Sequence, residues 1–199
     1  RRMKTDYLDV WQIHQVVTQQ EVDQILGPKG SLEAFVKAKQ QGKVRHIGFT
    51  GHADPAVHQR LLDSFDGWET VQHPVNLVDP HYLSFINSVM PNIRKKGIGL
   101  FGMKSNGMGA LTGLKIAGIH ECLRFAWSHD IDTLVSGTEW REHLEQNVAV
   151  LKTLVPMTKA EMADLLARTA RGKHGPGVEI YKKKPHTGAL PAHRDGEPA

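Results

Sequence analysis

The sequence predicts an α/β fold in which helices cover a parallel sheet. Short apolar segments rich in β-branched residues alternate five times with longer segments whose apolar residues recur at helical spacing. Strand-to-helix alternation of this kind requires right-handed crossovers, which are typical of parallel sheets. The 199 residues suffice for one core, whereas a complete eight-fold barrel usually needs about 250 residues.

The first predicted strand, ending at His14, organises the rest of the chain. Its residues Tyr7, Leu8, Val10, Trp11 and Ile13 are nearly continuous apolar sequence, as expected of a strand buried on both faces. A polar residue at the carboxyl end of a barrel strand points into the active-site mouth. We therefore expect a functional role for the histidine, with a structural role as the alternative. The other predicted strands are 44–50, 70–76, 98–104 and 133–137.

The predicted helices follow from apolar spacing and from capping residues. Residues 15–30 and 105–118 are expected to be loops. Ser31, Asp54 and Thr138 are expected N-caps, and Thr158 with Glu161 forms a capping box. Pro91 should interrupt its helix. The predicted helices are 31–41, one that starts at 54–55 and carries an inner stripe to 65, 79–96, 120–129, 139–154 and 158–168.

The domain boundary is expected near residue 170. Residues 1–170 show no internal linker and are predicted to form one domain. Residues 171–199 are rich in Gly, Pro, Lys and His, and we expect this tail to be largely disordered, at least after Tyr181. The first residue is Arg rather than Met, which is consistent with a missing N-terminal part.

Composition argues against several functional classes. The net charge of +4 includes the run Lys182-Lys183-Lys184 and marks no broad basic face, so nucleic-acid binding is not expected. No apolar run reaches the roughly 18 residues of a membrane span, and no signal-peptide core is present. The single Cys122 suits a reducing compartment, so the predicted location is cytoplasmic.

Four short motifs, in this order, resemble the aldo-keto reductases. They are Leu8–His14, Gly42–Thr50, Val71-Gln72, and Ser136-Gly137-Thr138 followed by Leu144–Asn147. The resemblance covers roughly residues 1–170. It implies an incomplete (β/α)8 TIM barrel of about five βα units, corresponding to strands four to eight. It also implies an oxidoreductase that reduces aldehydes or ketones, small carbonyl compounds, by hydride transfer from NADP, with NAD as the alternative.

The resemblance assigns one catalytic residue. His14 matches the family histidine that orients and polarises the carbonyl. The family's Asp, Tyr and Lys belong to earlier strands, which this sequence does not contain. Tyr7 is no substitute, because it lies at the start of its strand. We therefore expect a truncated family member with little or no reductase activity.

The resemblance also implies a set of cofactor contacts. Gln72 and Thr50 match contacts to the nicotinamide amide, although Gly51 departs from the family's Asn. Met103 takes the place of an aromatic residue that covers the ring, and Lys104, Ser105 and Gly107 begin the loop that crosses the pyrophosphate. The expected adenosine-phosphate contacts are Gly137, Thr138, His143 and Asn147.

The adenosine-phosphate assignment has independent support, and it has a weak point. A helix N-terminus at Thr138 would offer free N–H groups to a phosphate. His143 stands where many members have an Arg for the 2′-phosphate, and a neutral imidazole binds phosphate less well than a guanidinium. Arg141 is a nearby alternative cation.

Other interpretations of the same residues remain open. Thr138 would also serve as a plain N-cap, Gln72 as a satisfied interior amide and Met103 as core. The glycines 107, 109 and 113 would serve as flexible loop, since they form no phosphate-loop pattern. His46 with His52, or His73 with His81, could meet at strand ends, but no zinc-ligand spacing is present, so no metal is expected.

Two alternative functions follow from the truncation. One is a remnant that binds the cofactor without chemistry. The other is a half-barrel that depends on a partner and self-associates through its open sheet edge.

Overall fold

The computed structural model describes residues 4–170 and 175–182. The strands are β1 (Leu8–Ile13), β2 (Val44–Thr50), β3 (Thr70–Pro74), β4 (Gly99–Met103) and β5 (Thr133–Val135). The helices are α1 (Gln19–Leu26), α2 (Ser31–Gln40), α3 (Pro55–Ser64), α4 (Phe85–Ser88), α5 (Met90–Lys95), α6 (Ala110–Gly113), α7 (Ile119–Trp127), α8 (Arg141–Lys152) and α9 (Lys159–Ala170). Short 3-10 turns cover Asp79–His81, Gly107–Gly109, Gly175–Gly177 and Ile180–Lys182.

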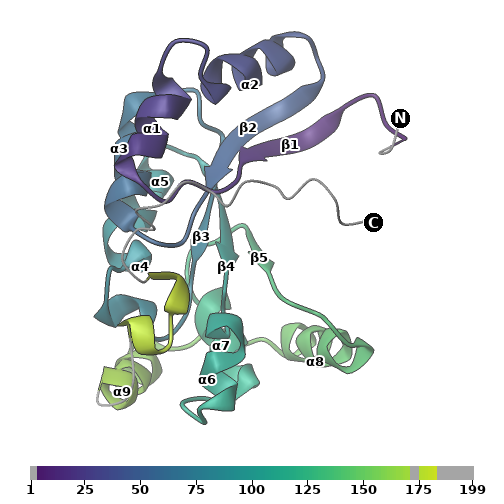
Figure 1. Ribbon diagram of the computed structural model, residues 1–199. Coiled ribbons are helices and arrows are strands. Elements are labelled where there is room, and N and C mark those ends of the chain that lie inside the picture. The colour runs from purple at the N-terminus through teal and green to yellow at the C-terminus, as the bar shows by residue number, and fades with distance from the viewer. Residues whose placement is uncertain (1–3, 171–174, 183–199) are drawn as a thin grey trace, which may run out of the picture.

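The five strands form one parallel sheet in the order β1-β2-β3-β4-β5 (Figure 1). The sheet curls, and the helices between its strands make it an incomplete (β/α)8 barrel, which confirms the predicted fold class. Neighbouring strands are in register through Phe49, Val71 and Leu100. Within the described ranges, β1 and β5 are each paired on one side only.

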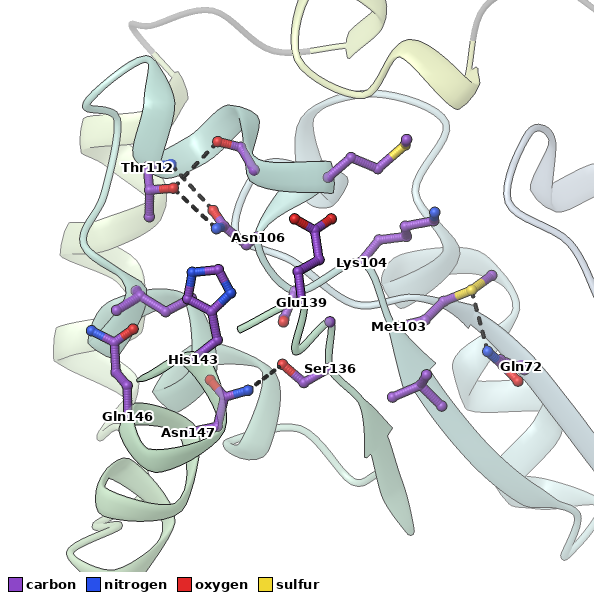
Figure 2. A pocket seen from close by; sticks show the side chains of 16 residues that line it. Gln72, Met103, Lys104, Asn106, Thr112, Ser136, Glu139, His143, Gln146 and Asn147 are labelled. Carbon is purple, nitrogen blue, oxygen red and sulfur yellow. Dashed lines mark hydrogen bonds between the residues drawn. The ribbon is translucent and has the colours of Figure 1, made fainter. Parts of the chain in front are cut away.

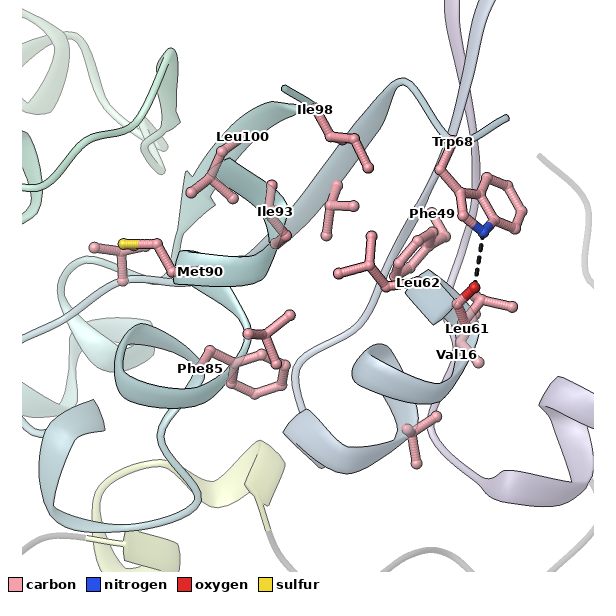
Figure 3. Packing of buried hydrophobic residues seen from close by; sticks show 14 of the residues in the cluster. Val16, Phe49, Leu61, Leu62, Trp68, Phe85, Met90, Ile93, Ile98 and Leu100 are labelled. Carbon is pink, nitrogen blue, oxygen red and sulfur yellow. Dashed lines mark hydrogen bonds between the residues drawn. The ribbon is translucent and has the colours of Figure 1, made fainter. Parts of the chain in front are cut away.

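The main core lies between the sheet and helices α3 and α5 (Figure 3). Phe49 of β2, Leu61 and Leu62 of α3 and Leu100 of β4 are fully buried there, because the apolar members of each element share one face. Trp68 adds its ring to this cluster and donates from Nε1–H to the Leu61 carbonyl at 2.9 Å. Its one polar group is thus satisfied inside the core.

A second core binds the last described segment to the barrel. Leu77, Leu111, Phe125 and Leu165 pack together, and Val178 completes the cluster. Residues 175–182 are therefore part of the fold, although they belong to the region predicted to be tail. The expected disorder at 171–174 and 183–199 lies outside the described residues.

The predicted loop at 15–30 is wrong in its middle, where α1 forms. Thr18 caps this helix by accepting from the Glu21 N–H at 3.1 Å, and the Glu21 carboxylate accepts from the Thr18 N–H at 2.8 Å. These two reciprocal hydrogen bonds stabilise the start of α1, although the sequence of this helix is mostly polar. The N-cap of α2 is Gly30, so the predicted cap at Ser31 is also wrong.

The predicted helix at 79–96 is divided into three pieces. Asp79 opens a short 3-10 turn, and its carboxylate then accepts from the backbone N–H groups of Phe85 and Ile86 at the start of α4. Pro91 lies in the first turn of α5, which confirms the predicted interruption. The predicted loop at 105–118 contains α6 and a preceding 3-10 turn.

The helix predicted from 139 begins two residues later. Its N-cap is Trp140, in extended conformation, and no side chain caps it. Thr138 lies too far before the first turn for its hydroxyl to reach the free N–H groups, so the predicted cap is wrong. The capping box of Thr158 and Glu161 is confirmed. The described residues contain no helix that is both long and apolar enough to cross a membrane.

Candidate functional site

A cleft of about 810 Å³ lies beyond the carboxyl ends of β4 and β5 (Figure 2). Loop residues after β4, the end of β5 and one face of α8 form its walls. Its lining combines polar and apolar residues, as in small-molecule sites. The lining residues are Gln72, Met103, Lys104, Ser105, Asn106, Met108, Gly109, Thr112, Ile119, Val135, Ser136, Gly137, Glu139, His143, Gln146 and Asn147.

Gln72 and Met103 form one end of the cleft. The Gln72 side-chain amide donates to the Met103 sulfur at 3.4 Å. Because thioether sulfur is a weak acceptor, this contact holds the amide in place at little cost to its capacity for a stronger partner. Met103 is itself almost buried.

The loop after β4 forms the upper wall of the cleft in Figure 2. Asn106 secures it, since its side-chain oxygen accepts from the Thr112 N–H at 3.1 Å and its amide donates to the Thr112 hydroxyl at 3.0 Å. Lys104 and buried Ser105 line the cleft. Gly107 does not line it: a side chain there would lie 3.4 Å from Leu111, away from the cleft, and its φ of +54° favours glycine.

The start of α8 and the end of β5 form the other end. Asn147 is almost buried, and its amide donates to the Ser136 hydroxyl at 3.0 Å, which ties the helix to the strand. Gly137 and His143 line the cleft, whereas Thr138 is exposed outside it. Arg141 donates to Glu145 at 2.7 Å on the exposed surface of the helix and does not line the cleft.

His14 and Thr50 lie beside the cleft. The His14 Nδ1 and Thr50 Oγ1 atoms are 3.2 Å apart at the ends of β1 and β2, and neither residue lines the cleft. Thr50 is in register with Gln72 of β3. His14, Thr50 and Gln72 therefore form a row across three neighbouring strands, from the residue after β1 and the last residue of β2 to the middle of β3, and this row leads into the cleft.

The neighbour of Thr50 has no space for a side chain. A Cβ at Gly51 would lie 2.4 Å from both the His58 Nε2 atom and the Val16 carbonyl oxygen. The departure from the family's Asn at this position is therefore fixed by the packing of His58. Tyr7 lies at the opposite end of the strand, where the Arg45 guanidinium is 4.2 Å from its ring centroid.

Residues 179–182 add a polar cluster that the sequence did not predict. The Tyr181 hydroxyl donates to Glu179 at 2.8 Å and accepts from the Asn76 amide at 3.0 Å. The Lys104 ammonium lies 5.8 Å from the Tyr181 ring centroid. Burial and the Glu179 carboxylate raise the pKa of Tyr181, so this phenol keeps its proton near neutral pH.

His52 extends the same cluster toward His14. Its ring centroid is 5.3 Å from that of Tyr181. Burial, followed by the charges of Lys104 and His14, lowers the pKa of His52 to about 4. The imidazole is therefore neutral near pH 7. A run of Glu, Tyr and Lys in a tail otherwise rich in Gly and Pro was the available sequence signal for this cluster.

The histidine pairs considered for a metal do not assemble a site. His46 pairs with Glu69 at 2.9 Å, and His73 Nδ1 lies 2.8 Å from the Pro74 carbonyl oxygen. His81 contacts the Thr169 hydroxyl at 3.0 Å. In residues 4–170 and 175–182, no three His, Cys, Asp or Glu side chains are grouped to hold a metal ion.

The cleft has the size and the donors for a dinucleotide. Its volume falls within the roughly 300–1,000 Å³ of typical cofactor and ligand sites. Gln72 offers an amide, Lys104 an ammonium and Ser105 a hydroxyl, while a Cβ at Gly137 would meet no atom within 4 Å. The donor set suits a ligand with an amide at one end and phosphates in its middle.

Comparisons with known proteins agree on the fold. Residues 1–122 match the family model described as the aldo/keto reductase family. No relative was found among curated protein sequences.

Solved structures give the same result. An aldo-keto reductase from Bacillus halodurans in its holo form is similar with a TM-score of 0.63 at 18% identity, over 90% of this chain and 66% of that one. A glycerol dehydrogenase from Gluconobacter oxydans is similar with a TM-score of 0.61 at 18% identity, over 88% and 63%. An aldo-keto reductase from a Medee basin deep-sea metagenome library gives 0.64 at 16% identity, over 89% and 66%. The chain thus spans just under two thirds of these structures.

Proposed function

Because this chain belongs to the aldo/keto reductase family, we propose that it forms the cofactor-binding part of an oxidoreductase that reduces aldehydes or ketones with a nicotinamide dinucleotide. The single observation that supports this most is the row of His14, Thr50 and Gln72 leading into the cleft. Carbonyl reduction needs a polarised carbonyl next to the cofactor ring, and the row puts a histidine beside the amide end of the cleft.

Different residues of the cleft would contact different parts of the dinucleotide. Gln72 would hold the carboxamide, Met103 would cover the ring, and Lys104 with Ser105 would contact the pyrophosphate. Ser136, Gly137 and Asn147 would face the adenosine half. The bound cofactor would supply the hydride. NADP is the cofactor expected from the family, with NAD as the alternative.

His14 would orient the carbonyl. When the Thr50 hydroxyl donates to Nδ1, the ring proton resides on Nε2, which is then free to donate to a carbonyl oxygen. Thr50 is almost buried, so its hydroxyl fixes the ring orientation. The histidine contributes polarisation in this arrangement, and the proton must come from another group.

Neither Tyr7 nor Tyr181 suits the role of proton donor beside His14. The pKa of Tyr181 is raised, and Tyr7 lies at the other end of its strand. We therefore propose that this chain binds the cofactor but turns over little substrate by itself. A binding remnant without chemistry is the alternative that the same observation favours.

The open sheet edges favour a second alternative, a half-barrel completed by a partner. β1 and β5 are each paired on one side within the described part of the chain. The helix that follows β5, α8, exposes Leu144, Val148 and Leu151, and its N-cap residue Trp140 is exposed as well. A surface of this kind is typical of an interface.

One set of measurements separates these proposals. The purified 199-residue chain is titrated with NADH and with NADPH by fluorescence, assayed for oxidation of either by a simple aldehyde, and sized by sedimentation. We expect binding of at least one cofactor with negligible turnover. Failure of both to bind would refute the cofactor proposal, and robust turnover would refute the proposed inactivity.

We also propose that the protein is cytoplasmic, as its single cysteine suggests. Cys122 is fully buried, and burial raises the pKa of its thiol to about 12. The thiol is therefore unreactive in the folded chain. Retention of the chain in a cytosolic cell fraction is the expected result.

A further inference from the structure

We propose that the cleft prefers NAD(H) over NADP(H) and that Glu139 sets this preference. The inference rests on the proposed function, because it concerns the same cofactor site. The two cofactors differ in one phosphate on the adenosine ribose, so the charges at the adenosine end decide between them. The resemblance to the family, by contrast, implies NADP as the cofactor and NAD as the alternative.

The geometry of the cleft identifies its adenosine end. Gln72 and Met103 occupy the end that adjoins Thr50 and His14, so the reacting ring belongs there. The cleft then runs past the loop after β4 to α8 (Figure 2). An extended dinucleotide would therefore place its adenosine ribose near Glu139, His143 and Asn147.

The charges along this path are unevenly distributed. Lys104 is the cation among the lining residues, and it follows β4 on the side where the pyrophosphate would lie. At the α8 end the charged lining residue is Glu139, which Figure 2 shows between the side chains of Lys104 and His143. A 2′-phosphate at this end would meet a carboxylate.

Arg141 is the nearby cation that could pair with a 2′-phosphate, but its side chain does not line the cleft. Arg141 donates to Glu145 at 2.7 Å, and both side chains are largely exposed on the outer surface of α8. His143 lines the cleft, but an imidazole lacks the fixed fork of donors with which arginine binds phosphate. The 2′-phosphate thus gains no strong partner from the described lining residues.

The adenosine ribose of NAD(H) is compatible with the Glu139 carboxylate. A free 2′-hydroxyl can donate to a carboxylate, as the ribose of NAD does to the acidic residue of Rossmann-type dinucleotide sites. The carboxylate of Glu139 would therefore attract one cofactor and repel the other. Because Glu139 is exposed, salt should weaken this discrimination.

Binding measurements on the full chain test the inference without relying on turnover. NADH and NADPH are titrated at low and moderate salt, and 5′-AMP and 2′,5′-adenosine bisphosphate are compared as competitors. We expect NADH to bind about ten-fold or more tightly than NADPH at low salt, and the ratio to shrink as salt rises. The nucleotide fragments should show the same order.

Substitutions then assign the preference to one residue. Glu139→Gln should reduce the ratio several-fold, and Glu139→Arg should reverse it. Glu142→Gln removes the same charge from an exposed residue in the first turn of α8, three positions from Glu139 and outside the cleft, and should leave the ratio unchanged.

Two different failures are distinguishable. If both cofactors bind with a ratio that Glu139→Gln does not alter, or if NADPH binds more tightly, the inference is overturned while the proposed function stands. If neither cofactor binds, the proposed function fails and the inference fails with it.

Discussion

The ammonium of Lys182 lies 2.6 Å from a carboxylate oxygen of Asp79, and neither side chain is exposed to solvent. Lys182 also contacts Glu179 at 2.9 Å and donates to the Tyr82 carbonyl at 2.9 Å. These contacts hold residues 179–182 against the turn after β3. They also supply the charge that two buried carboxylates require.

Replacing Lys182 with Met should lower the free energy of unfolding by roughly 3–5 kcal/mol, because it leaves buried carboxylates without a counter-charge. Urea unfolding followed by tryptophan fluorescence measures the change. Lys152→Met, on the exposed surface of α8, is the control and should change stability by less than about 0.5 kcal/mol. Equal stability of the two variants would show that the buried pair does not stabilise the fold.

The capping residues of α1 and α2 make a matched pair. Thr18→Ala should cost about 1 kcal/mol, because the Thr18 hydroxyl accepts from the Glu21 N–H. Ser31→Ala should have almost no effect, because Ser31 is the first helical residue and Gly30 is the N-cap. Thermal unfolding of both variants checks the difference, and a larger loss at Ser31 would contradict the assigned helix starts.

Acid should destabilise the chain through its buried histidines. Burial lowers the pKa of His73 to about 4, and burial with the charges of His73 and His52 lowers the pKa of His58 well below 6.5. As pH falls through 6.5, the unfolded chain binds protons that the folded chain excludes. Stability present at pH 7 is therefore lost as the pH decreases from 6.5 toward 4, by at most about 1.4 kcal/mol per pH unit for each histidine.

The variant His58→Leu tests this account. Both ring nitrogens of His58 are buried without a hydrogen-bond partner, so an apolar replacement removes a desolvated polar group. Between pH 6.5 and 5, the slope of the unfolding free energy against pH should decrease by the equivalent of about one proton taken up on unfolding. His120→Gln, at an exposed position, should keep the original slope. An unchanged slope in His58→Leu would exclude this residue as a source of acid lability.

The exposed apolar stripe of α8 should cause self-association. Leu144 and Leu151 are 52% and 44% exposed, while Asn147 and Val150 are the buried residues of this helix. The double variant Leu144→Gln, Leu151→Gln should lower the average mass in sedimentation at constant concentration. Its unfolding free energy should stay within about 1 kcal/mol of the parent. An unchanged mass would indicate that this stripe is not the contact surface.

Lys104 should carry the salt dependence of cofactor binding. Lys104→Met removes the cation beside the expected pyrophosphate and should weaken NADH binding by about ten-fold at low salt. The affinity of the variant should vary less with ionic strength. Lys115→Met, on the exposed loop after α6, is the control. Equal weakening by both variants would point to a general charge effect.

Much of the strand pattern was predictable because its signals are local. Val44–Thr50 carries its apolar residues in one short run, and the structure places β2 over those residues. The ends of β3, β4 and β5 lie one or two residues inside the predicted ranges. Residue type alone did not locate the helix starts, since Thr138 resembles a cap but the chain turns into a helix only after Trp140.

The site was predictable where residues follow strands and was missed where they do not. Gln72 lies within β3, Met103 ends β4 and Lys104 follows it, and all three line the cleft. Glu139 and Gln146 line it too, but only the conformation between β5 and α8 brings them there. Asn76 contacts Glu179 across 103 positions of sequence, and no local pattern reveals a pairing of that range.

The same long-range pairing bears on how the protein matures on the ribosome. Asp79 emerges about a hundred residues ahead of Lys182, and a nascent chain buries that carboxylate favourably only once its cation has been synthesised. The carboxylate in the turn after β3 therefore stays hydrated until residue 182 has been synthesised. The burial of this part of the interior is in this sense timed by the synthesis of the turn at Ile180–Lys182.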